Sequence, residues 1–205
     1  MTPVYAALAW CCLAYMSGCV SSPPPHIYVL RSARNVEDVT AAQRVDRIGL
    51  ATIAIPDYLH STDIVTRTGE HELVSSTTGR WGERLDVGLR DALASDLSAR
   101  LPITFVTTTR DIDASVRRLL VTVSTLDVWA DGRCILVASW SISGGSAALE
   151  FLSENTFRVD SGTWTGSRSD SQVVASIVAA VAMLADRIAA SLVEQPHPPF
   201  ATAGH

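Results

Sequence analysis

The sequence predicts an α+β domain in which one mixed or mainly antiparallel sheet is covered by two helices. Two stretches carry large apolar residues at helical spacing, one in the middle of the chain and one near its end. Shorter runs before and between them alternate or are continuously apolar, as strands are. Apolar residues make up 47% of the chain and charged residues 18%, which is enough apolar surface for a core and too little charge for a disordered chain.

The first part of the domain is predicted to consist of strands. Two strand-like runs precede Pro56, which ends the second of them. Two more flank Thr68-Gly69, a pair typical of a tight turn, and we expect them to form a short hairpin around it. In order, the four runs are residues 26–31, 47–55, 64–67 and 70–74.

A first helix is predicted over residues 81–101, because apolar side chains recur there at every fourth position. Pro102 stops the pattern. We expect Trp81 to open this helix and to pack in the core. The apolar stripe comprises Trp81, Leu85, Leu89, Leu93 and Leu97.

The second part of the domain is predicted to contain four more strands and a closing helix. Asp131-Gly132 is a turn signal between two long strands. The first of these alternates in polarity, which is typical of a strand with one wetter face, and Cys134 opens the second as a buried thiol. The strands are residues 103–106, 119–129, 134–142 and 155–159.

The closing helix is predicted over residues 171–193. Asp186 and Arg187 argue against a membrane span, and alanines would let the helix pack closely on the sheet. Its large apolar residues indicate a core helix, with a stripe of Ile177, Val181, Leu184, Ile188 and Leu192.

The N-terminus has the features of an export signal. Residues 4–15 are uncharged and apolar, and they are too few to span a bilayer as a helix. Met16-Ser17-Gly18-Cys19 follows and resembles the bacterial lipobox, in which the cysteine is acylated and becomes the new N-terminus. The alternative is an ordinary secretory signal with a chance cysteine, and residues 1–3 lack the usual positive charge.

These features predict four regions. A lipoprotein signal peptide comprises residues 1–18, and the lipidated Cys19 with a Pro/Ser tether comprises residues 19–25. A single globular domain comprises residues 26–194, and a Pro-rich, disordered tail comprises residues 195–205. Position 20 is valine and not the aspartate that retains lipoproteins at the inner membrane of enterobacteria, so we expect the periplasmic face of the outer membrane.

The charge of the chain bears on its ligands, and its cysteine content bears on disulfide formation. All sixteen basic residues are arginines and they are scattered, and the net charge is −5, which argues against nucleic acid as a ligand. After signal cleavage and acylation, Cys134 would be the one free thiol, so no intramolecular disulfide is expected.

Several segments together resemble the PqiC-type lipoproteins, also described as ABC-type transport auxiliary lipoproteins. The resemblance covers nearly the whole mature chain. It rests on Pro56-Asp57-Tyr58-Leu59, Ile64-Val65-Thr66-Arg67, Glu70, Leu73, Arg80-Trp81 and Leu85, with Tyr28-Val29-Leu30 and Ile188-Ala189 fitting the same pattern.

The resemblance implies a function in transport. Members of the family accompany MCE proteins, which carry phospholipid between the two membranes of Gram-negative bacteria. It implies an outer-membrane lipoprotein subunit that binds a periplasmic MCE-domain protein and supports membrane integrity. It leaves open a direct contact with phospholipid and a ring-like homo-oligomer. The alternatives are a structural lipoprotein of an outer-membrane complex and a lipid-binding module.

The loop from Pro56 to Arg67 is the candidate partner-binding site, with Tyr58, Leu59 and Arg67 as its contact residues. The alternative is that Tyr58 packs under the hairpin and that Arg67 pairs with Glu70 or Asp63. We expect no enzyme, no cofactor and no metal. A nucleophile elbow is absent from the sequence, and the polar residues of the hairpin region do not have metal-ligand spacing: His60, Asp63, Glu70, His71 and Glu72.

Overall fold

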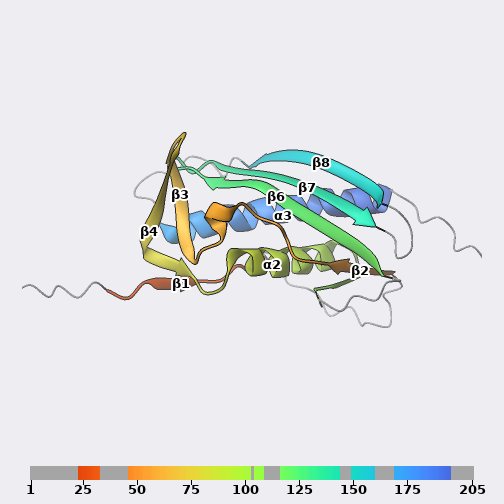
Figure 1. Ribbon diagram of the computed structural model, residues 1–205. Coiled ribbons are helices and arrows are strands. Elements are labelled where there is room, and N and C mark those ends of the chain that lie inside the picture. The colour runs from red at the N-terminus through yellow and green to blue at the C-terminus, as the bar shows by residue number, and fades with distance from the viewer. Residues whose placement is uncertain are drawn as a thin grey trace, which may run out of the picture.

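The structure is a computed structural model that describes residues 23–32, 46–102, 104–108, 116–143, 149–159 and 169–194. The predicted signal peptide, Cys19 and the tail from residue 195 lie outside these ranges. The α+β class is confirmed, with two helices over strands (Figure 1). The elements are β1 (His26–Tyr28), β2 (Asp46–Leu50), a 3-10 turn η2 (Asp57–Leu59), β3 (Asp63–Gly69), β4 (Glu72–Trp81), α2 (Leu85–Arg100), β5 (Thr104–Thr107), β6 (Arg117–Val128), β7 (Cys134–Ser143), β8 (Leu149–Val159) and α3 (Asp170–Glu194).

The described strands form two sheets where the sequence suggested one. A three-stranded sheet has the order β1-β4-β3, and a five-stranded sheet has the order β5-β2-β6-β7-β8. Both are mixed, because β1 is parallel to β4, and β2 is parallel to β5 and β6. Register shifts interrupt the β3–β4 hairpin, and such irregularities bend strands. An isolated bridge between Arg67 and Trp129 joins the two sheets.

Both helices pack on one another and over the strands. α3 lies against β6, β7 and β8, and α2 lies beside α3 (Figure 1). The predicted stripes of both helices are buried, as expected. α3 is long and apolar enough to cross a membrane by length and composition, but it supplies a large share of the buried core. The alanines at its packed face are Ala180, Ala185 and Ala189, whereas Ala175 and Ala179 face outward.

The start of α3 is well defined by its own sequence. Ser169 and Gln172 form a capping box, in which the Gln172 side chain accepts a hydrogen bond from the Ser169 backbone N–H at 3.0 Å. The Ser169 hydroxyl accepts one from the Gln172 backbone N–H at 3.4 Å. Asp170 follows in the first turn, where the helix dipole favours a carboxylate.

Trp81 is buried as predicted, but it does not belong to a helix. It is the last residue of β4 and is paired with Tyr28 of β1, and α2 begins four residues later. Its backbone N–H donates to Thr62 at 2.7 Å, and that of Gly82 donates to Tyr28 at 2.7 Å. These hydrogen bonds engage the backbone N–H groups of Trp81 and Gly82 in strand contacts and not in a helix. The helical spacing of Trp81 from Leu85 is therefore a coincidence.

The two predicted hairpins both form, with one correction. The turn of β3–β4 lies at Glu70 and His71, two residues beyond the predicted Thr68-Gly69, because β3 continues to Gly69 and pairs there with Glu72. The turn at Asp131-Gly132 is confirmed. Gly132 has a φ of 97°, a left-handed conformation that other residues avoid.

β6 has the predicted wetter face. Leu119, Val121 and Val123 are buried, whereas Leu120 is exposed. A bulge between Val123 and Thr125 then shifts the alternation, so Leu126 and Val128 also reach the core. β8 begins at Leu149, six residues before the predicted start.

Candidate partner-binding surface

The loop from Pro56 to Arg67 begins with a short turn in which Leu59 is buried. The backbone N–H of Leu59 donates to Pro56 at 3.0 Å, and that of His60 donates to Asp57 at 3.0 Å. Leu59 is 4% exposed and belongs to the core cluster. Leu59 therefore packs in the core beneath the loop.

Tyr58 and Arg67 converge on one carboxylate that the sequence analysis did not identify. The Tyr58 hydroxyl donates to Asp127 Oδ1 at 3.0 Å. The Arg67 guanidinium donates twice, from Nε to Oδ2 at 2.8 Å and from Nη2 to Oδ1 at 3.2 Å. Asp127 lies on β6, so one residue of the large sheet holds both the η2 turn and β3.

Arg67 thus has a different counter-charge from either predicted one. Glu70 takes part through its backbone oxygen, which accepts from Arg67 Nη1 at 2.9 Å. Asp63 pairs instead with Arg80. The available signal for Asp127 was a carboxylate between two apolar residues of β6, Leu126 and Val128, but the sequence does not reveal which side chains lie opposite it.

The surroundings of Tyr58 and Arg67 raise the pKa values of both side chains. Burial raises the pKa of the Tyr58 phenol, and the Asp127 charge raises it further. The hydrogen bonds to Asp127 raise the pKa of the Arg67 guanidinium. The phenol therefore remains a donor and the guanidinium a cation at physiological pH.

Beside this cluster, the two hairpin turns lie together. The Trp129 ring is near two guanidinium carbons, Arg133 at 4.8 Å and Arg67 at 5.8 Å from its centroid. The Ala130 backbone N–H donates to the Arg67 oxygen at 3.0 Å, which fixes one turn to the other. We call the outer part of this region the tip surface, made of Glu70, His71, Glu72, Trp129, Asp131 and Arg133.

The polar residues of the hairpin region do not converge on a metal position. Within the described ranges, no group of three His, Cys, Asp or Glu side chains is arranged to hold an ion. His60 contacts the Ile55 oxygen, and Glu72 accepts from Thr68 at 2.7 Å. These local contacts account for two of the five residues weighed as metal ligands.

Cys134 is a free, fully buried thiol, as the sequence predicted. Burial, and to a lesser extent the Asp127 charge, raises the pKa of the thiol to about 12. It is therefore an unreactive core residue under the tip surface, beside Val128 on the neighbouring strand.

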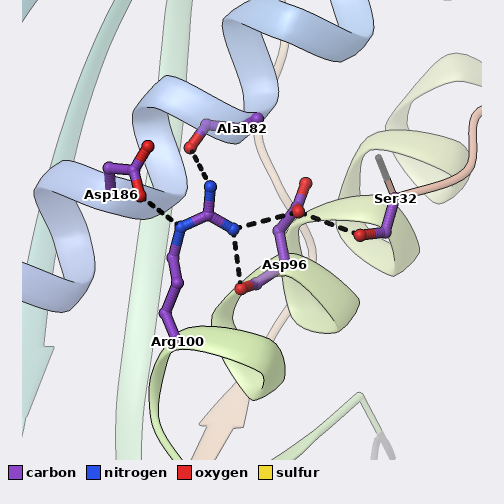
Figure 2. A network of polar contacts seen from close by, with 5 residues as sticks. All are labelled: Ser32, Asp96, Arg100, Ala182 and Asp186. Carbon is purple, nitrogen blue, oxygen red and sulfur yellow. Dashed lines mark hydrogen bonds and ion pairs between the residues drawn. The ribbon is translucent and has the colours of Figure 1, made fainter. Parts of the chain in front are cut away.

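A second polar network links the two helices (Figure 2). Arg100 of α2 donates to Asp186 Oδ1 at 2.5 Å and to the Ala182 backbone oxygen at 2.9 Å, both on α3. It also donates to the backbone and side-chain oxygens of Asp96, at 2.9 and 3.0 Å. Ser32 donates to the same carboxylate at 2.9 Å, which fastens the chain after β1 to the helix pair.

The fold is that of a small α+β domain, and a lipobox-like motif lies upstream of it in the sequence. Residues 28–189 match the family model described as ABC-type transport auxiliary lipoprotein component, and the chain belongs to that family. This match confirms the family that the sequence segments resemble. The family is one of transport auxiliary lipoproteins and not an enzyme class.

Curated relatives agree with this assignment. The chain is 26% identical over 130 residues to the intermembrane transport lipoprotein PqiC of Escherichia coli K12, a match that covers 63% of this chain and 69% of the relative. The protein of the same name from Shigella flexneri matches with the same identity and coverage.

Solved structures share the fold. A crystal structure of an uncharacterized protein has a TM-score of 0.68 at 19% identity, over 83% of this chain and 99% of that one. A Xanthomonas campestris protein has a TM-score of 0.60 at 14% identity, over 84% and 95% of the two chains. At these identities the likeness establishes the fold alone.

Proposed function

We propose that this chain is an outer-membrane lipoprotein subunit of an MCE-type intermembrane phospholipid transport system. Cys19 carries the lipid anchor, and the domain binds a periplasmic MCE-domain protein. The observation that carries the proposal is the match of residues 28–189 to a family of transport auxiliary lipoproteins, together with the lipobox-like sequence that ends at Cys19.

The geometry of the small sheet supports a place for the partner. β4 begins at Glu72, next to the hairpin turn, and pairs with β1 from Gly79 onward. The step from Glu72 to Gly79 spans about 23 Å at the usual rise of a strand. Figure 1 shows β1 at the lower edge of the molecule and the turn at the top. Because the tether leads directly into β1, the tip surface lies at the end of this sheet away from the anchor.

The tip surface also has suitable chemistry. Tryptophan and arginine are enriched among the residues that dominate interfaces, and Trp129 and Arg133 lie together there. The bonds from Tyr58 and Arg67 to Asp127 hold the turn in place before any partner arrives. A preorganised surface loses less conformational entropy on binding. In this proposal Tyr58, Leu59 and Arg67 serve binding by shaping the surface.

The experiment is capture of the MCE-domain protein from detergent-solubilised membranes. The tagged wild type is compared with a double charge reversal at the tip surface, Glu70→Arg with Arg133→Glu. The matched control is Arg187→Glu on the outer side of α3. We expect the tip variant to retain wild-type melting and to lose roughly tenfold or more of the captured partner, and the control to lose none.

Two results would count against the proposal. Undiminished capture by the tip variant would move the interface to another face. Failure of the wild type to capture any MCE-domain protein would reject the transport role, and would favour the alternative of a structural lipoprotein or a lipid-binding module.

A further inference from the structure

Two large apolar side chains are exposed next to each other on β1 and just after it. Ile27 is 63% exposed and Val29 is 46% exposed. A Cβ atom placed on Gly82 would lie 2.9 Å from Ile27 and 3.2 Å from Val29, so both side chains lie on the same face over this bare glycine. The other exposed large apolar residues of the described chain are spread over β4, β6 and α3: Val74, Leu120, Met183 and Val193.

The position of this pair in the chain indicates what covers it. Ile27 is eight residues after Cys19, so the two Cα atoms are at most about 29 Å apart even in a fully extended chain. Residues 23–25 are three prolines, all exposed, which stiffens the connection. β1 is therefore the described strand that lies nearest to Cys19 along the chain, and a lipid anchor at Cys19 would hold it close to the membrane.

The same strand is poorly suited to pairing with a second copy of the chain. β1 is the edge of its sheet, but it has three residues and follows directly after Pro25. Short strands flanked by proline are a common way of blunting a sheet edge. Leu30 is buried and Arg31 is exposed, so the outward face continues from Ile27 through Val29 to a cation. Apolar side chains beside a basic residue suit the interface of a phospholipid membrane.

We propose that Ile27 and Val29 rest on the phospholipid surface of the membrane that holds the Cys19 anchor. This inference rests on the lipid anchor of the proposed function. Contact at β1 gives the domain a fixed orientation, with the tip surface directed away from that membrane. The acyl chains hold the protein on the bilayer, and the Ile27–Val29 face determines which side of the domain faces it.

The test uses the full mature lipoprotein in vesicles of phosphatidylethanolamine and phosphatidylglycerol. A single cysteine at position 27 or 29, from Ile27→Cys or Val29→Cys, carries a polarity-sensitive fluorophore. Cys134 is buried, with a thiol pKa of about 12, and acylation blocks Cys19, so the new cysteine is labelled selectively. Val74→Cys is the matched control, since Val74 is also exposed and lies near the tip of the same sheet.

We expect phospholipid brominated on its acyl chains to quench the fluorophore at positions 27 and 29 roughly threefold more than at position 74. Equal quenching at the three positions would overturn the inference. Protection of position 27 from aqueous iodide without quenching by brominated lipid would also overturn it, and would indicate that another protein surface covers β1.

Mass measurement of the same preparation separates this inference from its premise. An unacylated Cys19 would reject the anchor, and the membrane contact with it. An acylated Cys19 with equal quenching at all positions would reject the membrane contact alone and leave the proposed function standing.

Discussion

The two ends of the small sheet β1-β4-β3 are held by different kinds of contact. At the tip, the Asp127 carboxylate accepts charge-assisted hydrogen bonds from Arg67 and a hydrogen bond from Tyr58. At the base, β1 is held by strand pairing and close packing, and the polar contacts of the adjoining β4 residues, Thr78 with Asp170 and Arg80 with Asp63, are exposed to solvent. A Cβ atom on Gly79 would lie 2.5 Å from Asp170 and 2.9 Å from Tyr28. A single strand, β4, connects a bonded polar end to a closely packed end with an apolar outer face.

The residues that carry the family resemblance are therefore not the most exposed residues of this sheet. The signature residues Tyr58, Leu59 and Arg67 are occupied inside the protein. Exposed residues lie beside them at the hairpin turn (Glu70 and His71) or at the opposite end on β1. The contacts described at the two ends involve different side chains, and Glu72 and Gly79 lie about 23 Å apart along β4 at the usual rise of a strand, so substitutions at one end should leave the other unchanged.

The largest expected effect concerns the anchor on which the orientation depends. Cells supplied with labelled palmitate should label the wild type, and Cys19→Ser should remain an unlabelled precursor of higher mass. A protein without acyl groups lacks the membrane attachment that two or three acyl chains provide. Normal processing and unchanged membrane fractionation of Cys19→Ser would show that the lipobox assignment is wrong.

Removal of the tip carboxylate should have the largest effect on stability. Asp127→Ala leaves the Arg67 guanidinium, 16% exposed, without its counter-charge. We expect urea unfolding to show a loss of about 2–4 kcal/mol, somewhat less than for a fully buried pair because water reaches Arg67. Asp91→Ala removes an exposed ion pair with Arg90 and should cost less than about 1 kcal/mol. Equal losses in the two variants would mean that the Asp127 cluster does not hold the hairpin.

At the base, the close approach to Gly79 can be tested separately. Gly79→Ala places a methyl group against the Asp170 carboxylate and the Tyr28 ring, and should cost about 1–3 kcal/mol. Gly69→Ala is the control, because its nearest neighbour would be 3.6 Å away, and it should change stability by less than about 0.5 kcal/mol. Combined with Asp127→Ala, the Gly79 change should be additive, and strong coupling would contradict the separation of the two ends.

The smallest expected effect at neutral pH is that of the thiol under the tip surface. The pKa of Cys134 is raised from 9.0 to about 12, so the folded state holds its proton where the unfolded state releases it. This contribution to stability is complete below about pH 9 and falls as the pH rises towards 12, by about 1.4 kcal/mol per unit. Cys134→Val should flatten that alkaline loss. A native chain that reacts with a bulky maleimide as fast as the denatured chain would place the thiol at the surface.

The sequence predicted the local patterns better than the contacts between them. The stripes of α2 and α3, the turn at Gly132 and the buried Cys134 follow from spacing and residue type. Trp81 was assigned to a helix because its strand partner, Tyr28, is more than fifty residues away and invisible to periodicity. The counter-charge of Arg67 was missed for the same reason, because Asp127 comes sixty residues later. The division into two sheets likewise depends on the long-range pairing of β1 with β4.

We propose that the tip surface meets the MCE-domain protein while the base faces the anchoring membrane. Site-specific photo-cross-linking in living cells tests it most directly, with the photoreactive residue placed at His71 in the tip turn or at Leu120 on the outer face of β6. We expect an adduct of this chain with an MCE-domain protein from position 71 and none from position 120. An adduct from position 120 with none from position 71 would contradict it.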